Sequence, residues 1–312
     1  MRLAYLDSLK GFLILLVVWG HVVQNAAVDF FSSVSFRTIY SFHMGAFFFV
    51  SGIVLRLGRH GIGELPGKIR CLLVPYLSWY LLCYFCRPIP FNDALVSIFS
   101  CNSIGLWFLF TLSECIVVCI ISEVLAPKQH YEIWMVAIGV ILIGLAMLGQ
   151  NQYVDVRHFA KFYQYFLGGY LMSMHCKWIV SSQRYVDKYN SYSIVLVSVF
   201  FVVGLVVAAI TSFSGIKFQI YKAIVSWAGC ISLVAIFKML PQRGAVFKML
   251  SATGKMTLGI YAVHVFLMLL FGGYVRSWQL SATFVALLVS SVVIVLAIRR
   301  VSIVAMVLLG RY

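Results

Sequence analysis

The first apolar segment places a cation and an imidazole on one helix face. Lys10 and His21 are eleven residues apart, with an apolar run from Phe12 to Gly20 between them. At 1.5 Å per residue they lie about 16 Å apart along a helix, and three turns bring them to nearly the same face. An ionisable residue at membrane depth is costly and marks a candidate functional site. His21 is therefore the first candidate for a catalytic base, and the alternative is a structural histidine bonded to a neighbouring helix.

Three further ionisable side chains fall within apolar stretches: His43, Glu114 and His264. If the first two spans are neighbours, His43 lies at a depth similar to that of His21, and the two imidazoles could share a cavity. The alternative is an interfacial histidine that reaches water. Glu114 could hold an imidazole in one tautomer or bind a sugar hydroxyl, or it could be a structural carboxylate bonded to Ser or Tyr. His264 suits helix packing and cavity lining equally well.

Positive side chains gather around the loop between the second and third apolar segments. Arg56 and Arg59 end one segment, and Lys68 and Arg70 begin the next. Because Arg and Lys bind phosphate well, Lys10, Arg56 and Arg59 are candidates for holding the phosphates of a cytoplasmic cofactor. The alternative is a pure topology signal, since cytoplasmic loops have an excess of positive charge.

The composition indicates which elements must hold these side chains. Of the 312 residues, 62% are hydrophobic and 11% are charged, and the mean hydropathy is +0.99, whereas soluble domains have about 25% charged residues. At about 20 apolar residues per transmembrane helix, we predict an all-α integral membrane protein with about ten spans. We expect residues 1–312 to form a single domain with no fused extracytoplasmic domain. The predicted spans are 10–28, 39–57, 69–86, 105–125, 132–150, 158–175, 191–213, 218–239, 257–274 and 280–298. Residues 301–309 are too short to span alone and could extend the tenth helix or lie at the interface.

The distribution of positive charge predicts the orientation. The net charge is +15, from 24 Lys and Arg against 9 Asp and Glu, which in a soluble protein would suggest a nucleic-acid partner. With the N-terminus inside, most of these cations fall in cytoplasmic loops. We therefore expect both termini in the cytoplasm, a lipid bilayer around the chain and no nucleic-acid partner. The cysteines are scattered and their one Cys-x-x-Cys pair stands alone, so no metal site is expected. The oligomeric state is left open.

The start of the chain resembles the acyltransferase type 3 family of membrane O-acyltransferases. Residues 5–11 (YLDSLKG), the apolar run and His21 resemble the first helix of that family, in which a basic residue, usually Arg, is followed by ten residues and then His. Lys10 stands in the place of that Arg, as in the branch that resembles fucose O-acetylases. The exchange matters because Lys cannot make the bidentate contacts of Arg.

Three later segments extend the resemblance, in order, over nearly the whole chain. Residues 42–52 are similar to the second-helix pattern of the family, with Gly45-Ala46 in place of the usual Pro-Leu. Residues 106–109 resemble the fourth helix of the same branch, and residues 254–264 resemble its late motif, which ends in His264. Each motif is short and apolar, but together they are fairly specific.

The resemblance implies a ten-helix bundle that takes an acyl group, usually acetyl, from cytoplasmic acyl-CoA. It implies transfer to a hydroxyl, often of a sugar in a surface polysaccharide or a lipid-linked precursor. We therefore expect acetyl-CoA as the donor, a carbohydrate acceptor and a place in the bacterial cytoplasmic (inner) membrane. Lys10, Arg56 and Arg59 would bind the acyl-CoA phosphates, and Trp107 and His264 would contact the acceptor.

Acyl transfer to an alcohol needs a base for the hydroxyl proton and stabilisation of a tetrahedral oxyanion. An imidazole suits the first role because its ordinary pKa is near 6.5, so His21 is predicted as the base. His43 would orient the reactants or donate to the oxyanion, and Glu114 would fix one imidazole in the correct tautomer. Direct transfer and an acyl-His intermediate fit the sequence equally well.

Two other classes of function compete with this interpretation. A multi-span transporter or flippase for a glycan or lipid-linked sugar would also have His and Glu inside the membrane. Against it stand the absence of a convincing internal repeat and of paired segments broken by Gly or Pro. A non-catalytic membrane scaffold would leave the ionisable residues within the apolar segments unexplained.

Overall fold

A computed structural model gives the fold of residues 3–26, 29–58, 61–87, 89–100, 105–126, 129–148, 156–180, 188–211, 215–272 and 279–310. Every regular element in these ranges is a helix. In chain order they are α1 (Ala4–Ala26), η1 (Phe30–Ser32), α2 (Val34–Tyr40), α3 (His43–Leu57), η2 (Ile62–Glu64), α4 (Leu65–Cys86), α5 (Phe91–Ser100), α6 (Trp107–Leu125), α7 (Tyr131–Leu148), α8 (Val156–His175), α9 (Lys177–Val180), α10 (Lys188–Ile210), α11 (Gly215–Met239), α12 (Ala245–Gly254), α13 (Thr257–Phe271), α14 (Leu280–Ile298) and α15 (Ser302–Leu309).

The prediction of an all-α membrane protein is confirmed by these helices. Each of the ten predicted spans coincides with the greater part of one helix, namely α1, α3, α4, α6, α7, α8, α10, α11, α13 or α14. By length and composition, seven described segments can cross a membrane, or eight if α12 and α13, which meet at an angle of 73°, form one broken span. Of the other two helices, α7 is apolar over a shorter length and α8 does not qualify. The count of ten spans therefore stays a prediction.

The helices differ in how much of their apolar surface is covered by protein. About two thirds of the apolar window of α1 is buried (67%), compared with 22% in α10 and 17% in α14. Val195, Leu196, Val289 and Val293 on these two outer helices are all more than half exposed. Helices that are apolar all round and expose such side chains are those that contact lipid in a membrane protein. The interior of the helix bundle is therefore formed around α1.

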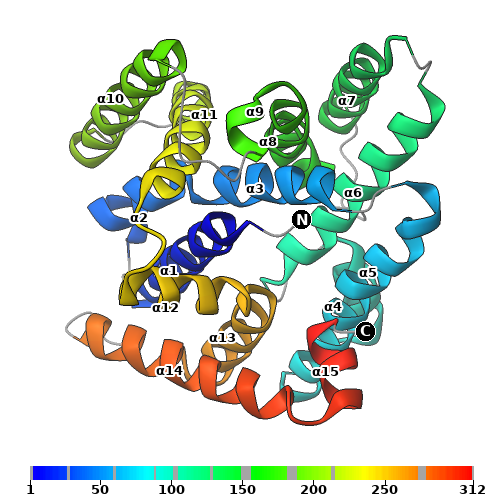
Figure 1. Ribbon diagram of the computed structural model, residues 1–312. Coiled ribbons are helices and arrows are strands. Elements are labelled where there is room, and N and C mark those ends of the chain that lie inside the picture. The colour runs from blue at the N-terminus through cyan, green and yellow to red at the C-terminus, as the bar shows by residue number, and fades with distance from the viewer. Residues whose placement is uncertain are drawn as a thin grey trace.

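The first helix is the centre of the packing. It contacts α2, α3, α11, α12, α13 and α14. In Figure 1 it lies near the middle of the assembly, with α10 and α11 on one side and α4 and α15 on the other. Side chains from distant parts of the sequence therefore meet on α1, which is the helix that holds Lys10 and His21.

Glycines allow two of these helix pairs to approach closely. Where α3 crosses α8, a Cβ on Gly52 would collide with the carbonyl of Phe166, and a Cβ on Gly169 would collide with the carbonyl of Phe49. Where α1 crosses α12, Gly254 approaches the carbonyl of Asp7 in the same way. Small residues at helix crossings let backbones pack together when lipid provides no hydrophobic force between helices. The positions of His43 on α3 and His21 on α1 depend on these crossings.

Several short helices were not predicted from the sequence. α5 lies between the third and fourth predicted spans, and α12 precedes the ninth. The final apolar stretch does not extend α14, and its place at the membrane interface stays a prediction. It forms α15, which packs against α4, and Trp79 Nε1–H donates to the carbonyl of Leu308 at 2.9 Å. α15 ends at Gly310, whose φ of 62° lies in the left-handed region that favours glycine.

Candidate functional site

Two histidines from opposite ends of the chain form a hydrogen-bonded pair in the interior. His21 Nδ1 lies 3.0 Å from His264 Nε2, and the ring centroids are 5.1 Å apart with 30° between the planes. His264 is fully buried and His21 is partly buried. The pair forms because α1 and α13 pack together. We call His21 and His264 the histidine dyad.

The partner of His264 on its own helix determines where the protons of the dyad lie. His264 Nδ1 is 2.8 Å from the carbonyl oxygen of Ile260. A carbonyl oxygen only accepts hydrogen bonds, so Nδ1 of His264 must be protonated, and in a neutral ring Nε2 is then an acceptor. His21 Nδ1–H must therefore donate to His264 Nε2. In the neutral dyad this leaves His21 Nε2 with a free lone pair, which is the arrangement that a general base requires.

The helix turn that holds His264 also fixes the start of α6. Tyr261 Oη–H donates to the carbonyl of Gly105 at 2.5 Å, and the N–H of Phe108 donates to Tyr261 Oη at 3.4 Å. Gly105 has a φ of 72°, a left-handed conformation that favours glycine at this turn. α13 thus positions both His264 and Trp107, the first residue of α6.

Trp107 forms an aromatic wall with α8. Its ring is stacked on His158 at 4.2 Å with 14° between the planes, and on Phe162 at 5.3 Å with 20°. His158 and Phe162 are one turn apart on α8, so they present one continuous face to Trp107. The expected contact of Trp107 with the acceptor stays a prediction.

His43 begins α3 and is held by the end of the preceding helix, α2. Its Nδ1 is 2.7 Å from the carbonyl of Ile39, and its ring packs edge-on against Tyr40 at 4.7 Å. Tyr40 Oη–H in turn donates to Gln24 Oε1 at 3.1 Å, which ties this turn to the end of α1. By the same reasoning as for His264, a neutral His43 presents an unprotonated Nε2. It can accept a hydrogen bond from a hydroxyl, but it cannot donate to an oxyanion in that state.

The sequence suggested that His21 and His43 could share a cavity if their two helices are neighbours. The helices α1 and α3 are in contact, and His43 lies close enough to His21 for a charge on one ring to act on the other. The direct partner of His21 is His264, which the sequence identified as a candidate without predicting this contact. One feature of the sequence could have indicated this contact. His21 and His264 both lie within apolar segments, and an ionisable side chain in a membrane needs a polar partner.

A cationic pocket lies next to Lys10. Its volume is about 500 Å³, and its wall combines side chains from α1, α3, α4 and α6. Lys10, Lys68 and Arg70 line it together with Glu64. Lys10 Nζ also pairs with Asp7 Oδ1 at 2.9 Å, one helical turn away. Three cations against one lining carboxylate suit the binding of phosphate groups. We call this space the inner pocket.

Arg56 is not among the residues that line the inner pocket, although Val54 and Leu55 are. It lies close enough to Tyr131 at the start of α7 and to Tyr170 of α8 for its charge to act on them. Arg59, the third residue expected to bind the donor, lies outside the described residues.

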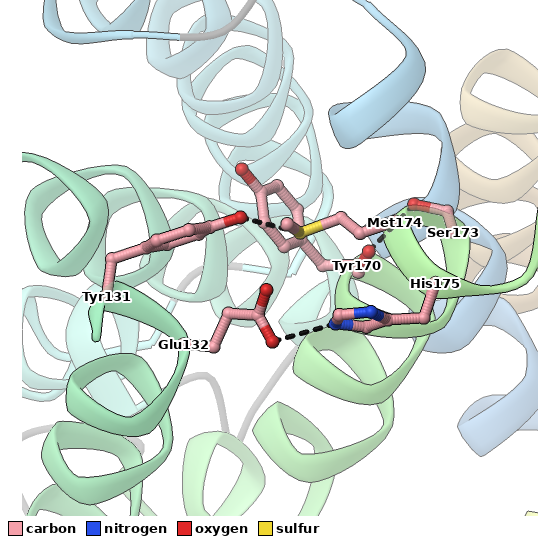
Figure 2. Close-up of polar contacts among 6 residues, drawn as sticks. All are labelled: Tyr131, Glu132, Tyr170, Ser173, Met174 and His175. Carbon is pink, nitrogen blue, oxygen red and sulfur yellow. Dashed lines mark hydrogen bonds and ion pairs between the residues drawn. The ribbon is translucent and has the colours of Figure 1, made fainter. Parts of the chain in front are cut away.

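The cluster beside Arg56 connects the start of α7 to the end of α8 (Figure 2). Glu132 Oε2 pairs with His175 Nε2 at 2.7 Å, and Tyr131 Oη–H points at the sulfur of Met174 at 3.6 Å. Ser173 Oγ–H donates to the carbonyl of Tyr170 within α8. The side chain of His175 is 62% exposed, and exposed ion pairs contribute about 0–1 kcal/mol. This cluster is best understood as a structural link between two helices.

Glu114 lies in a different pocket from the one formed around Lys10. The second pocket has a volume of about 560 Å³ and is bounded by α4, α6, α7 and α8. Glu114 and Ser113 provide polar groups in a lining that is otherwise apolar, including Phe110 and Phe159. His21 already has His264 as its hydrogen-bond partner. The tautomer of His21 is therefore fixed by His264, and not by Glu114 as the sequence suggested.

Among the described residues, no group of three His, Cys, Asp or Glu side chains is placed to hold a metal ion.

Comparison with known proteins gives a match over nearly the whole chain. A family model described as an acyltransferase domain matches residues 3–300. The "Nodulation protein NolL" of Mesorhizobium japonicum (strain LMG 29417 / CECT 9101 / MAFF 303099) is 26% identical over 211 residues, which are 62% of this chain and 53% of that protein. The chain thus spans about half the length of this curated relative. No solved structure matches the chain.

Proposed function

The chain belongs to the family of acyltransferase domains, and from this premise we propose that it is a membrane O-acetyltransferase. In this proposal acetyl-CoA is the donor, and the acceptor is a hydroxyl on a sugar of a surface polysaccharide or its lipid-linked precursor. The single observation that supports the chemistry most strongly is the chain of hydrogen bonds from His21 through His264 to the carbonyl of Ile260.

This chain of hydrogen bonds suits His21 for the role of general base. His21 Nε2 takes the proton of the acceptor hydroxyl, and the hydroxyl oxygen attacks the thioester carbonyl carbon. The positive charge that forms on His21 is shared with His264, whose Nε2 accepts the Nδ1–H of His21. His264 acts as a positioning residue in this step, because it holds His21 in the tautomer that leaves Nε2 unprotonated.

The second half of the reaction returns the proton. The tetrahedral intermediate breaks its carbon–sulfur bond, the acetyl ester of the sugar forms, and the thiolate of coenzyme A receives the proton from His21. His43 presents Nε2 as an acceptor and would orient the sugar hydroxyl, while Trp107 would stack on the sugar ring. An acetyl-His21 intermediate is the alternative route, and radiolabel that stays on the wild-type protein in single turnover without acceptor, is released by hydroxylamine and is absent from His21→Ala would reveal it.

The donor would bind at the inner pocket. Lys10, Lys68 and Arg70 line that pocket and would bind the phosphates of coenzyme A. The position of Arg56 beside α7 and α8 favours Lys68 and Arg70 over Arg56 for this role. Lys10 and His21 lie about 16 Å apart along α1, so a donor anchored near Lys10 needs an extended arm to bring its thioester to the dyad, and acyl-CoA has one.

The orientation of the chain is part of the same proposal. We place both termini in the cytoplasm and the chain in a bacterial inner membrane, because the excess of Lys and Arg falls in the loops on that side. The inner pocket then faces the cytoplasm, where acyl-CoA is made. The proposal is tested by incubating the purified protein in lipid nanodiscs with radiolabelled acetyl-CoA and the surface glycan of the host strain. Transfer of label to the glycan supports it, and a transporter or flippase would consume no acetyl-CoA.

A further inference from the structure

Two lysines come together where α8 packs against α11. Tyr165 Oη–H on α8 donates to the carbonyl of Ala223 on α11 at 3.5 Å. Lys161 precedes Tyr165 by one helical turn, and Lys222 directly precedes Ala223. This contact brings the segments of α8 and α11 that contain the two lysines close together, near enough for the charge of Lys161 to act on Lys222. Lys161 is exposed and Lys222 is partly buried.

The lysine pair lies near His43. Lys161 and Lys222 are both close enough for their charges to act on the His43 imidazole. A hydrogen bond holds α11 next to the start of α3. Ser226, one turn beyond Lys222, donates through Oγ–H to the carbonyl of Phe42 at 3.5 Å. α11 is thereby tied to the residue that precedes His43.

The lysine pair is also continuous with the aromatic wall. Lys161 Nζ lies 5.3 Å from the centroid of the Phe162 ring, and Phe162 stacks on Trp107. Lys161 is therefore linked through Phe162 to the ring of Trp107, the residue expected to contact the acceptor. Two cations thus lie near both this aromatic wall and His43.

We propose that Lys161 and Lys222 bind an anionic group of the acceptor, a carboxylate or a phosphate, and so select acidic acceptors. This inference rests on the proposed function, because it extends the acceptor side of the same site. Two like charges held together at a site of low polarity repel each other, and an oxyanion between them replaces that repulsion with two charge-assisted hydrogen bonds. Lysine is a compact point charge on a flexible stem, which suits a single oxyanion.

Two sources could supply this oxyanion. One is the carboxylate of an acidic sugar, and the other is the phosphate that joins a sugar to its lipid carrier. The shared chemistry is a negatively charged oxygen cluster a short distance from the hydroxyl that receives the acetyl group. Separate probes distinguish the two sources.

The test measures binding directly, without acetyl transfer. The purified full-length protein is placed in nanodiscs of neutral phosphatidylcholine and titrated calorimetrically with methyl glucuronide, inorganic pyrophosphate and the uncharged methyl glucoside. We expect wild-type protein to bind at least one anionic probe and to bind methyl glucoside at least about tenfold more weakly. The K161Q/K222Q variant should lose about tenfold or more in affinity for that anionic probe, while K161R/K222R keeps it.

Two matched variants control for the removal of charge alone. R87Q/R157Q removes two exposed cations at the end of α4 and the start of α8, and K68Q/R70Q removes those of the inner pocket. Both should keep the affinity for methyl glucuronide within about twofold, and R87Q/R157Q should do the same for pyrophosphate. Because the inner pocket is itself proposed to bind phosphate, pyrophosphate binding with and without the lysine pair is compared in proteins that all carry K68Q/R70Q. If K161Q/K222Q does not fold, K161Q alone serves, because Lys161 is exposed.

The outcomes separate this inference from the proposed function. Loss of glucuronide binding alone identifies a sugar carboxylate, and loss of pyrophosphate binding alone identifies a phosphate. The inference is overturned if wild-type protein binds neither anion, or if binding survives in K161Q/K222Q, even where acetyl transfer is normal. Lysine-dependent binding in a protein that transfers no acetyl group would instead uphold the anion site and overturn the proposed function.

Discussion

His21 Nδ1 and His264 Nε2 lie 3.0 Å apart, although 243 positions separate the two residues in the sequence. Each imidazole is the polar partner that the other needs in an apolar interior. The carbonyl of Ile260 orients the pair by accepting from His264 Nδ1–H at 2.8 Å. One backbone carbonyl on α13 therefore decides that the free lone pair belongs to His21 Nε2.

The first prediction concerns His264 as a positioning residue. His264→Leu removes the acceptor for His21 Nδ1–H, so His21 can rotate or change tautomer. We expect kcat to fall about 10²-fold or more, with little change in the KM for acetyl-CoA. Steady-state transfer of radiolabelled acetyl groups measures both constants.

His264→Gln is the matched variant for this prediction. A glutamine oxygen can accept from His21 near the former position of Nε2, so kcat should stay within about tenfold of wild type. Equal losses of kcat in the Leu and Gln variants, with both proteins folded, would show that acceptance of this hydrogen bond is not what matters.

The second prediction separates the cations of the inner pocket from Arg56. Lys68→Gln and Arg70→Gln should each raise the KM for acetyl-CoA about tenfold, because each removes a charge-assisted hydrogen bond to phosphate. Lys10→Gln should act in the same direction. Arg56→Gln is the control, since Arg56 does not line the inner pocket and lies near Tyr131 and Tyr170, and it should leave this KM within about twofold. A larger effect of Arg56 than of Arg70 would move the donor site to the α7–α8 side.

The third prediction concerns Trp107 as a sugar platform. Trp107→Ala removes the flat surface beside His158 and Phe162 and should raise the KM for the acceptor glycan about tenfold. Trp107→Phe keeps an aromatic face and should keep most of the affinity. An unchanged acceptor KM in Trp107→Ala would reduce Trp107 to a packing residue.

The fourth prediction concerns the crossing of α3 and α8. Gly52→Ala places a Cβ against the carbonyl of Phe166, and the resulting overpacking should cost about 1–3 kcal/mol of stability. Gly144→Ala is the control, because nothing lies within 4 Å of a Cβ at that position. Thermal unfolding in detergent should show a lower midpoint for Gly52→Ala and an equal or higher one for Gly144→Ala. Equal midpoints would mean that the two helices can separate freely.

The helices were largely predictable from the sequence, because a membrane span has a strong compositional signal. Long apolar runs of about 20 residues identified the greater part of α1, α4 and α14, for example. The short helices were harder to predict. α12 and α15 contain too few residues to span a membrane. α12 is positioned by its contacts with α1 and α15 by its contacts with α4, and hydropathy does not predict such contacts.

The sequence indicated which histidines belong to the candidate site, but it did not indicate which of them contact each other. Because only 11% of the chain is charged, His21, His43 and His264 stood out in apolar segments. Their pairing depends on which helices touch, and the sequence does not order the helices in space. The same limit applies to Lys161 and Lys222, whose nearness depends on the contact between α8 and α11.

The most direct test of the account is acetyl transfer by the His21→Ala variant. The purified variant and wild-type protein are compared in nanodiscs with radiolabelled acetyl-CoA and host surface glycan, and thermal unfolding confirms that both are folded. The account predicts a loss of about 10³-fold or more in the variant, because a base in the transition state is removed, with the KM for acetyl-CoA nearly unchanged. Transfer within about tenfold of wild type by a folded His21→Ala protein would contradict the account.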